Sequence, residues 1–80
     1  MDEPMLLDVR GSGCADVLIR LARLAGSVSE SNHDVIVWTD DRGAPTELPA
    51  WCRMTNHRYV GPVADLPDRY LLILHPKDEP

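Results

Sequence analysis

Residues 6–14 read LLDVRGSGC and carry the clearest structural signal in the chain. The first of these residues, through Val9, have the apolar character of a short buried strand, and the two glycines, Gly11 and Gly13, are typical of a tight turn. The next ten residues, ADVLIRLARL, form a strong helix-forming segment. The pattern therefore predicts a strand, a glycine turn and a helix, with Cys14 at or next to the helix N-cap.

This position gives the Cys14 thiol a chemical interpretation. Unpaired backbone N–H groups and the positive end of the helix dipole meet at a helix N-terminus, and both favour a thiolate over a thiol. A structural cysteine usually lies in an apolar run, whereas Cys14 follows Gly-Ser-Gly. Two interpretations stay open at this point: a reactive thiol, or a small residue at a helix cap whose thiol is incidental.

Hydrophobic spacing and turn residues divide the rest of the chain into helices and strands. The second helix is expected within residues 45–55, with its well-formed part starting near Leu48 so that Pro49 lies in the first turn. The other expected segments are a strand at 5–9, a helix from Ala15 to about Ser29, a loop at 29–34, strands at 35–38, 57–63 and 70–74, and a frayed tail at 76–80.

The order βαβαββ predicts an α+β fold, a two-layer sandwich in which a mixed four-stranded sheet carries both helices on one face. Eighty residues fit a single domain spanning 1–80, with a core at about 5–75. The net charge of −5 argues against binding to a nucleic-acid backbone. No apolar run approaches the roughly 20 residues that span a membrane, and the N-terminus lacks a signal peptide, so the cytoplasm is the expected location.

Several other side chains have a structural interpretation. Cys52 falls on the apolar face of the second helix and is expected to be a buried core thiol. Two cysteines without CxxC or paired Cys/His spacing predict neither a disulfide scaffold nor a zinc site. Trp38 and Trp51 are expected to be core aromatic residues.

The polar residues between the elements allow similar interpretations. Asp40 and Asp41 are expected to close a turn and assist the start of the second helix, in preference to binding a metal. His57 is expected to cap the end of that helix. His33 and His75 are expected to be exposed residues of a loop and of the tail.

Three segments together resemble one known family. They are LDVRG at residues 7–11 followed by Cys14, LPAWCRMTNH at 48–57, and YLLI at 70–73. Over residues 5–75 the chain is similar to the TusA/SirA-like sulfur-carrier family, whose fold is a βαβαββ two-layer sandwich. The resemblance implies that Cys14 carries sulfur as a persulfide, without a metal or an organic cofactor.

The resemblance also implies partners and supporting residues. A cysteine desulfurase or another sulfurtransferase would be the donor, and the acceptor would serve tRNA thiolation or the synthesis of a cofactor or thio-metabolite. Around Cys14, Gly11 and Gly13 would shape the loop. Arg10 is either solvated or holds an anion near Cys14. Arg20 and Arg23 form either a solvated helix face or a docking site for the partner.

The chain departs from the family at its active motif. Where the family has Cys-Pro-x-Pro, residues 14–17 read CADV. The loss of proline leaves the helix start more mobile but keeps the nucleophile. Asp16 adds a carboxylate near the sulfur that disfavours a thiolate, by an amount comparable to the benefit of the helix end.

These features leave three functions open. The leading one is a persulfide sulfur carrier that acts through Cys14. The alternative is a non-catalytic interaction or regulatory module that keeps the fold. A cysteine redox or peroxide sensor would need a resolving thiol, and Cys52 is the available candidate.

Overall fold

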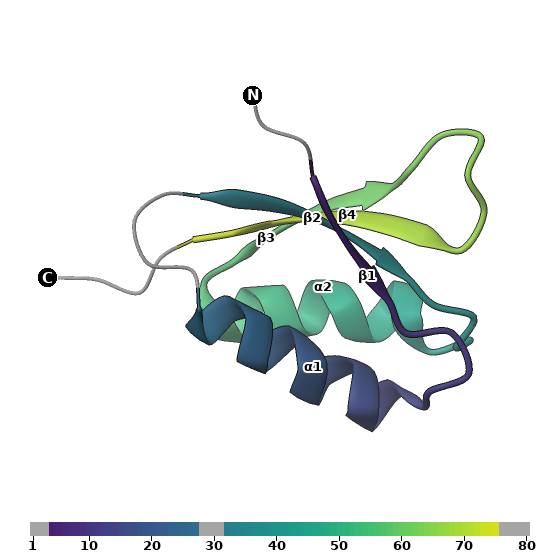
Figure 1. The fold of residues 1–80 in the computed structure, drawn as a ribbon, viewed down its shortest axis with the longest axis horizontal. Coiled ribbons are helices and arrows are strands. Elements are labelled where there is room, and N and C mark those ends of the chain that lie inside the picture. The colour runs from purple at the N-terminus through teal and green to yellow at the C-terminus, as the bar shows by residue number, and fades with distance from the viewer. Residues whose placement is uncertain (1–3, 28–31, 76–80) are drawn as a thin grey trace, which may run out of the picture.

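The computed structural model describes residues 4–27 and 32–75, with Cys14 through its backbone alone. Within these residues the elements follow the predicted order βαβαββ (Figure 1). Their bounds are β1 (Met5–Asp8), α1 (Cys14–Gly26), β2 (His33–Trp38), α2 (Ala44–Thr55), β3 (Arg58–Pro62) and β4 (Arg69–Leu74). The predicted end of the first helix at Ser29 and the predicted frayed tail at 76–80 lie outside the described residues.

The described strands form one four-stranded sheet in the order β1-β2-β4-β3. The β1 and β2 strands are parallel, whereas β4 is antiparallel to both β2 and β3. A parallel pair needs a crossover connection, and α1 provides it. Both helices lie against the same face of the sheet (Figure 1). The predicted α+β sandwich with a mixed sheet is therefore confirmed.

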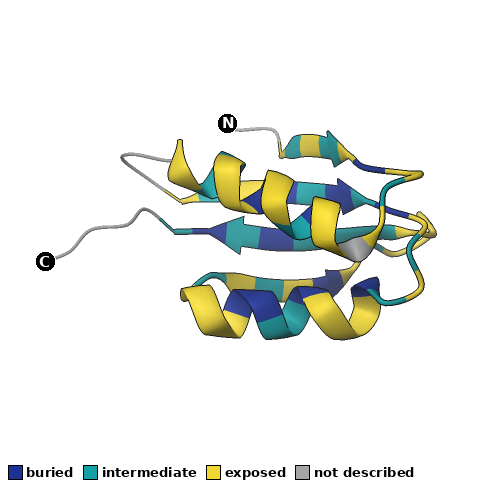
Figure 2. Cartoon of the chain, turned by 90° about the horizontal axis from the view of Figure 1, so that it is seen from below, coloured by how far each residue is buried: buried dark blue, intermediate teal, exposed yellow. Residues whose placement is uncertain are grey.

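The core lies between the sheet and the two helices. Alternate residues of a strand point to opposite faces, and the residues that point toward the helices are buried or partly buried. In Figure 2 the buried parts of both helices face the sheet and their outer sides are exposed. The fully buried residues of this core include Leu21 of α1, Val35 and Val37 of β2, Leu48 of α2, and Leu72 and Leu74 of β4.

The opposite face of the sheet has no such cover among the described residues. Leu6 on β1 is 57% exposed. Ile36 and Leu71, its neighbours across β2 and β4, are half-buried and do not belong to the core cluster. One face of the sheet thus supplies the core, and the other keeps an apolar row in contact with solvent.

The α2 helix starts earlier than predicted. It begins at Ala44, so Pro49 lies inside the helix, and the predicted start near Leu48 is wrong. Asp41 starts the helix upstream: its Oδ2 accepts a hydrogen bond from the Gly43 N–H (3.0 Å), and its carbonyl accepts one from the Ala44 N–H (3.2 Å). Proline inside a helix removes one hydrogen bond, here to the carbonyl of Pro45 in the exposed first turn.

The two faces of the sheet predict different costs for one substitution. Leu72→Ala should lower the free energy of unfolding by about 2–5 kcal/mol, because it leaves a cavity in the core. Leu6→Ala, the control, should change it by less than about 0.5 kcal/mol, because most of that side chain is exposed. Urea denaturation followed by circular dichroism measures both. Equal losses would mean that the uncovered face is packed in solution.

Candidate functional site

Three connections meet at one end of the molecule. They are residues 9–13 after β1, residues 39–43 after β2, and residues 63–68 between β3 and β4 (Figure 1). The parallel pairing of β1 with β2 brings the first two together, since the carboxyl ends of parallel strands share an edge. The Thr39 N–H donates to the Asp68 carbonyl (3.0 Å) and joins the third connection to them. Both helices begin at this edge.

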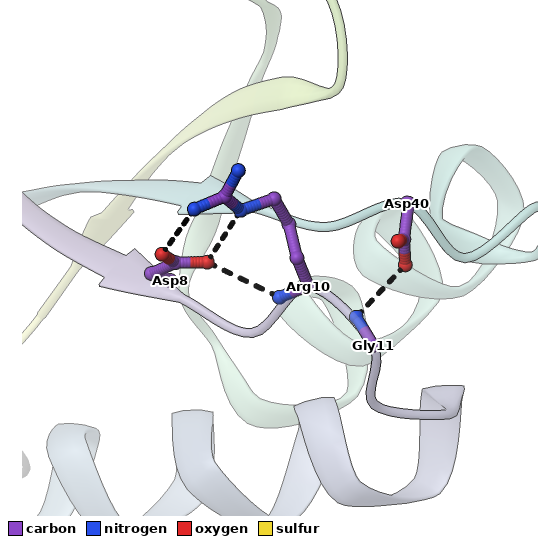
Figure 3. Close-up of polar contacts among 4 residues, drawn as sticks. All are labelled: Asp8, Arg10, Gly11 and Asp40. Atoms are coloured by element: carbon purple, nitrogen blue, oxygen red, sulfur yellow. Dashed lines mark hydrogen bonds and ion pairs between the residues drawn. The ribbon is translucent and has the colours of Figure 1, made fainter.

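The connection that leads to Cys14 is held against the sheet by hydrogen bonds. The Val9 N–H donates to the Trp38 carbonyl (2.9 Å), and the Ser12 N–H donates to the Val9 carbonyl (3.1 Å). Gly11 turns the chain with φ +84°, a conformation that favours glycine. Its N–H donates to Oδ1 of Asp40 (3.1 Å; Figure 3). The turn is therefore fixed to the residue two positions beyond β2.

Cys14 is the first residue of α1, as the sequence predicts within one position. The N-cap is Gly13, with extended φ −74° and ψ 168°, and among the described residues no side chain caps this end. The first intrahelical bond runs from the Val17 N–H to the Gly13 carbonyl (3.1 Å). The N–H groups of Ala15 and Asp16 precede that bond, so helix geometry leaves them available to an anion.

Some of the predicted supporting residues lie beside Cys14 in the structure, and others do not. Gly11, Gly13 and the exposed Asp16 lie within the turn and the first helical turn around Cys14. Arg10 points elsewhere: its side chain turns back over the sheet toward Asp8 (Figure 3). Arg20 and Arg23 are exposed on α1, and their predicted role in docking stays a prediction.

Arg10 and Asp8 form a bidentate pair. Nε of Arg10 donates to Oδ1 of Asp8 (2.9 Å), Nη2 donates to Oδ2 (2.8 Å), and the Arg10 backbone N–H also donates to Oδ1 (3.2 Å). These side-chain and backbone hydrogen bonds lower the pKa of Asp8 to about 2. The same pairing raises the pKa of Arg10. Arg10 is therefore neither simply solvated nor directed at the start of α1.

Trp38 is not a core residue, and that prediction is wrong. It is half-buried, and its register neighbours Asp8 and Arg69 place it on the face of the sheet that the helices leave uncovered. The guanidinium carbon of Arg10 lies 3.4 Å from the ring centroid, and that of Arg69 lies 3.9 Å from it. Strand alternation explains the placement, because Val37 takes the core side. Trp51 is buried in the core, as predicted.

Asp40 has a role that the sequence analysis missed. Asp41 assists the start of α2 as predicted, whereas the Asp40 carboxylate binds the Gly11 N–H of the Cys14 connection. The signal that could have found it is strand order. If the strands at 5–9 and 35–38 are parallel neighbours, the residues after them lie at the same edge of the sheet.

Cys52 is buried, with 1% of its surface exposed, which confirms its predicted place in the core. Burial raises the pKa of its thiol to about 11. The thiol is consequently protonated near neutral pH, and a protonated, buried thiol is a poor nucleophile and a poor resolving group.

The three histidines make more contacts with the rest of the fold than the sequence predicts. The C-cap of α2 is Asn56, with φ 64°, while the His57 ring stacks on Trp51 with centroids 5.1 Å apart. Nδ1 of His57 accepts a hydrogen bond from the His75 backbone N–H (3.0 Å). His33 is the first residue of β2, and both His33 and His75 are half-buried. The His57 backbone N–H donates to the Cys52 carbonyl (2.9 Å) at the end of α2. The expected exposure of His33 and His75 is wrong, because the ends of α2, β2 and β4 pack together.

In the part of the chain that the structure describes, no cluster of three or more His, Cys, Asp or Glu residues could hold a metal ion. In the same residues no helix is long and apolar enough to cross a membrane. No protein-family model and no curated protein matches this sequence.

The Gly11 turn predicts a contrast between two neighbouring glycines. Gly11→Ser should lower the free energy of unfolding by about 1–2 kcal/mol, because the positive φ strains any residue with a Cβ. Gly13→Ser should be neutral or stabilising, because its φ is ordinary and serine is a good N-cap. Thermal or urea unfolding of both variants measures the contrast, and the reverse order would mean that the turn differs from the one described.

The Asp8–Arg10 pair predicts a shifted titration. The Asp8 carboxyl should titrate near pH 2 in the wild type and at a higher pH in Arg10→Gln, which loses the side-chain hydrogen bonds but keeps the backbone N–H donor. Its side-chain carbon shift in NMR follows both titrations. Because the folded pKa is lowered, the pair stabilises the fold above pH 4 and loses that contribution as pH falls toward 2. An unchanged midpoint in Arg10→Gln would show that another group lowers it.

Proposed function

We propose that this protein is a sulfur carrier that accepts persulfide sulfur on Cys14 and relays it to an acceptor protein. The observation that carries the proposal is the position of Cys14 as the first residue of a helix whose N-terminus is not capped by any side chain that the structure describes. The resemblance of residues 7–14 and 48–57 to the TusA/SirA-like family supports the same function. Metal and organic cofactors are not needed for this chemistry.

The proposed transfer balances without an external oxidant. The Cys14 thiolate attacks the outer sulfur of a donor persulfide, a new S–S bond forms at Cys14, and the donor S–S bond breaks to release the donor thiolate. An acceptor thiolate then attacks the outer sulfur on Cys14. That sulfur passes to the acceptor, and Cys14 leaves as a thiolate ready for another cycle.

The residues around Cys14 have distinct parts in this proposal. The N–H groups of Ala15 and Asp16 favour the thiolate and the persulfide anion, because they lie at the positive end of the helix. The Asp40 carboxylate positions the turn through the Gly11 N–H. The Asp16 side chain opposes the anion, which limits its stability and assists release of the sulfur.

The partners follow from the same proposal. The donor would be a cysteine desulfurase or another sulfurtransferase, and the acceptor would serve tRNA thiolation or the synthesis of a cofactor or thio-metabolite. Arg20 and Arg23 on the outer side of α1 are candidate docking residues because they are exposed and lie on the helix that begins with Cys14. A reducing compartment such as the cytoplasm suits the function, because it keeps free thiols from forming stable disulfides.

A second function is supported by the exposed apolar row on the uncovered face of the sheet. A module that only binds another protein, without sulfur chemistry, would use this face and leave Cys14 idle. The absence of the Cys-Pro-x-Pro prolines favours this alternative. Sulfur loading distinguishes the two functions.

Incubation with a cysteine desulfurase and cysteine should add the mass of sulfur to the peptide that contains Cys14. Cys14→Ser should abolish the addition, whereas Cys52→Ala should load like the wild type, because that thiol is buried and protonated. Peptide mass spectrometry under non-reducing conditions measures the result. Failure of the folded wild-type protein to load from donors that load a Cys-Pro-x-Pro carrier would reject the carrier function.

The uncapped helix end predicts a further effect on loading. Gly13→Ser places a hydroxyl where it can accept the N–H of Ala15 or Asp16, so it should slow sulfur loading by up to about tenfold while keeping the fold. Gly13→Ala, the control, lacks that oxygen and should load nearly as fast as the wild type. Equal rates in all three proteins would show that these N–H groups do not stabilise the sulfur anion.

A further inference from the structure

The face of the sheet that the helices leave uncovered has an ordered arrangement of side chains. Strand register aligns Asp8, Trp38 and Arg69 in one row across β1, β2 and β4. The next row, two residues back along β1 and β2, is apolar and consists of Leu6, Ile36 and Leu71. We call these two rows the uncovered sheet face. At the strand rise of about 3.3 Å per residue, the rows lie about 7 Å apart.

Trp38 is the centre of the charged row. The guanidinium groups of Arg10 and Arg69 lie 3.4 Å and 3.9 Å from its ring centroid. Two planar groups cannot both occupy the space over one side of a ring at these distances, so they lie on opposite sides. The indole therefore holds two arginines by cation–π contact and restricts their orientation.

The two arginines differ in whether a carboxylate pairs with them. The Arg10 guanidinium is paired with Asp8, whose carboxylate accepts hydrogen bonds from two of its N–H groups. By contrast, the Arg69 guanidinium makes no hydrogen bond or ion pair within the described part of the chain, although it is half-buried and stacked on Trp38. A planar guanidinium held in this way presents donors that match a carboxylate.

We propose that the uncovered sheet face binds an acidic, apolar segment of a partner protein, with one carboxylate on Arg69 and an apolar side chain on the row of Leu6, Ile36 and Leu71. The spacing of the rows fits an extended segment in which an acidic residue and an apolar residue are two positions apart, since residues i and i+2 of a strand share a face. Arg69 stacked on Trp38 is the specificity element, and the apolar row supplies buried area.

Charge favours a peptide carboxylate over a nucleic-acid phosphate. The chain has a net charge of −5, so a polyanion is repelled at long range. A single carboxylate would be recognised at short range by the Arg69 guanidinium, while salt screens the repulsion from the more distant charges of the chain. The adjoining Leu6, which is 57% exposed, suits an amino-acid side chain better than a sugar.

The charged row lies at the end of the sheet where α1 begins, since Asp8 and Trp38 are the last residues of their strands. A partner bound there would lie at the same end of the molecule as Cys14. Docking does not depend on the proposed sulfur transfer, however, and the experiment uses the Cys14→Ser variant to keep the two separate.

The test uses the peptide acetyl-SESLSLS-amide and its neutral counterpart acetyl-SQSLSLS-amide, each titrated into isotope-labelled Cys14→Ser protein. The acidic peptide should shift the indole N–H signal of Trp38 and leave that of the buried Trp51 unchanged. Adding Arg69→Gln should weaken binding by about tenfold or more, because it removes the charged partner. Arg53→Gln, a control at an exposed position on α2, should bind like the Cys14→Ser parent.

Each outcome bears on the proposal. Tighter binding of the acidic peptide that requires Arg69 supports it. Equal binding of both peptides, equal losses in Arg69→Gln and Arg53→Gln, or shifts confined to other faces would overturn it. Signals of the uncovered sheet face that move with protein concentration, together with a dimer in sedimentation that Arg69→Gln abolishes, would assign the face to a second copy of the chain instead.

Discussion

The parallel pairing of β1 with β2 sets the position of α1 and of the connections that surround Cys14. A parallel pair cannot be closed by a hairpin, so the chain must cross over, and here it does so through α1. The crossover consists of the connection at residues 9–13 and then α1, whose first residue is Cys14. The same pairing brings the residues after β2 to the same edge, where Asp40 binds the Gly11 N–H.

A second consequence is that all the helical cover lies on one face of the sheet. With both helices on that face, side chains such as Val35, Val37 and Leu72 are fully buried, and the opposite side of the same strands keeps its side chains at the surface. Among the described residues, the uncovered sheet face is therefore a consequence of topology, and its ordered arginines make it a recognition surface.

The edge of the sheet presents two different environments for an anion. At the start of α1 the donors are backbone N–H groups, whose positions are set by helix geometry and do not depend on the side chains. On the uncovered sheet face the donor is the side chain of Arg69, oriented by Trp38. The first suits a small sulfur anion on the chain itself, and the second suits a carboxylate supplied by another protein. Arg10 contributes to neither environment, because its guanidinium is already hydrogen-bonded to the Asp8 carboxylate.

Hydrophobic periodicity and turn residues are local signals. They were enough to predict the order βαβαββ, the strand–turn–helix that places Cys14, and the burial of Cys52. The sequence misplaced the start of α2, because the hydrogen bond that the Asp41 carboxylate accepts from the Gly43 N–H starts the helix upstream of Pro49. Local signals did not predict which carboxylate holds the Gly11 turn, where the Arg10 guanidinium lies, or that Trp38 faces outward between two arginines. These features depend on which strands are neighbours and which face the helices cover, and contacts between segments distant in the chain settle both.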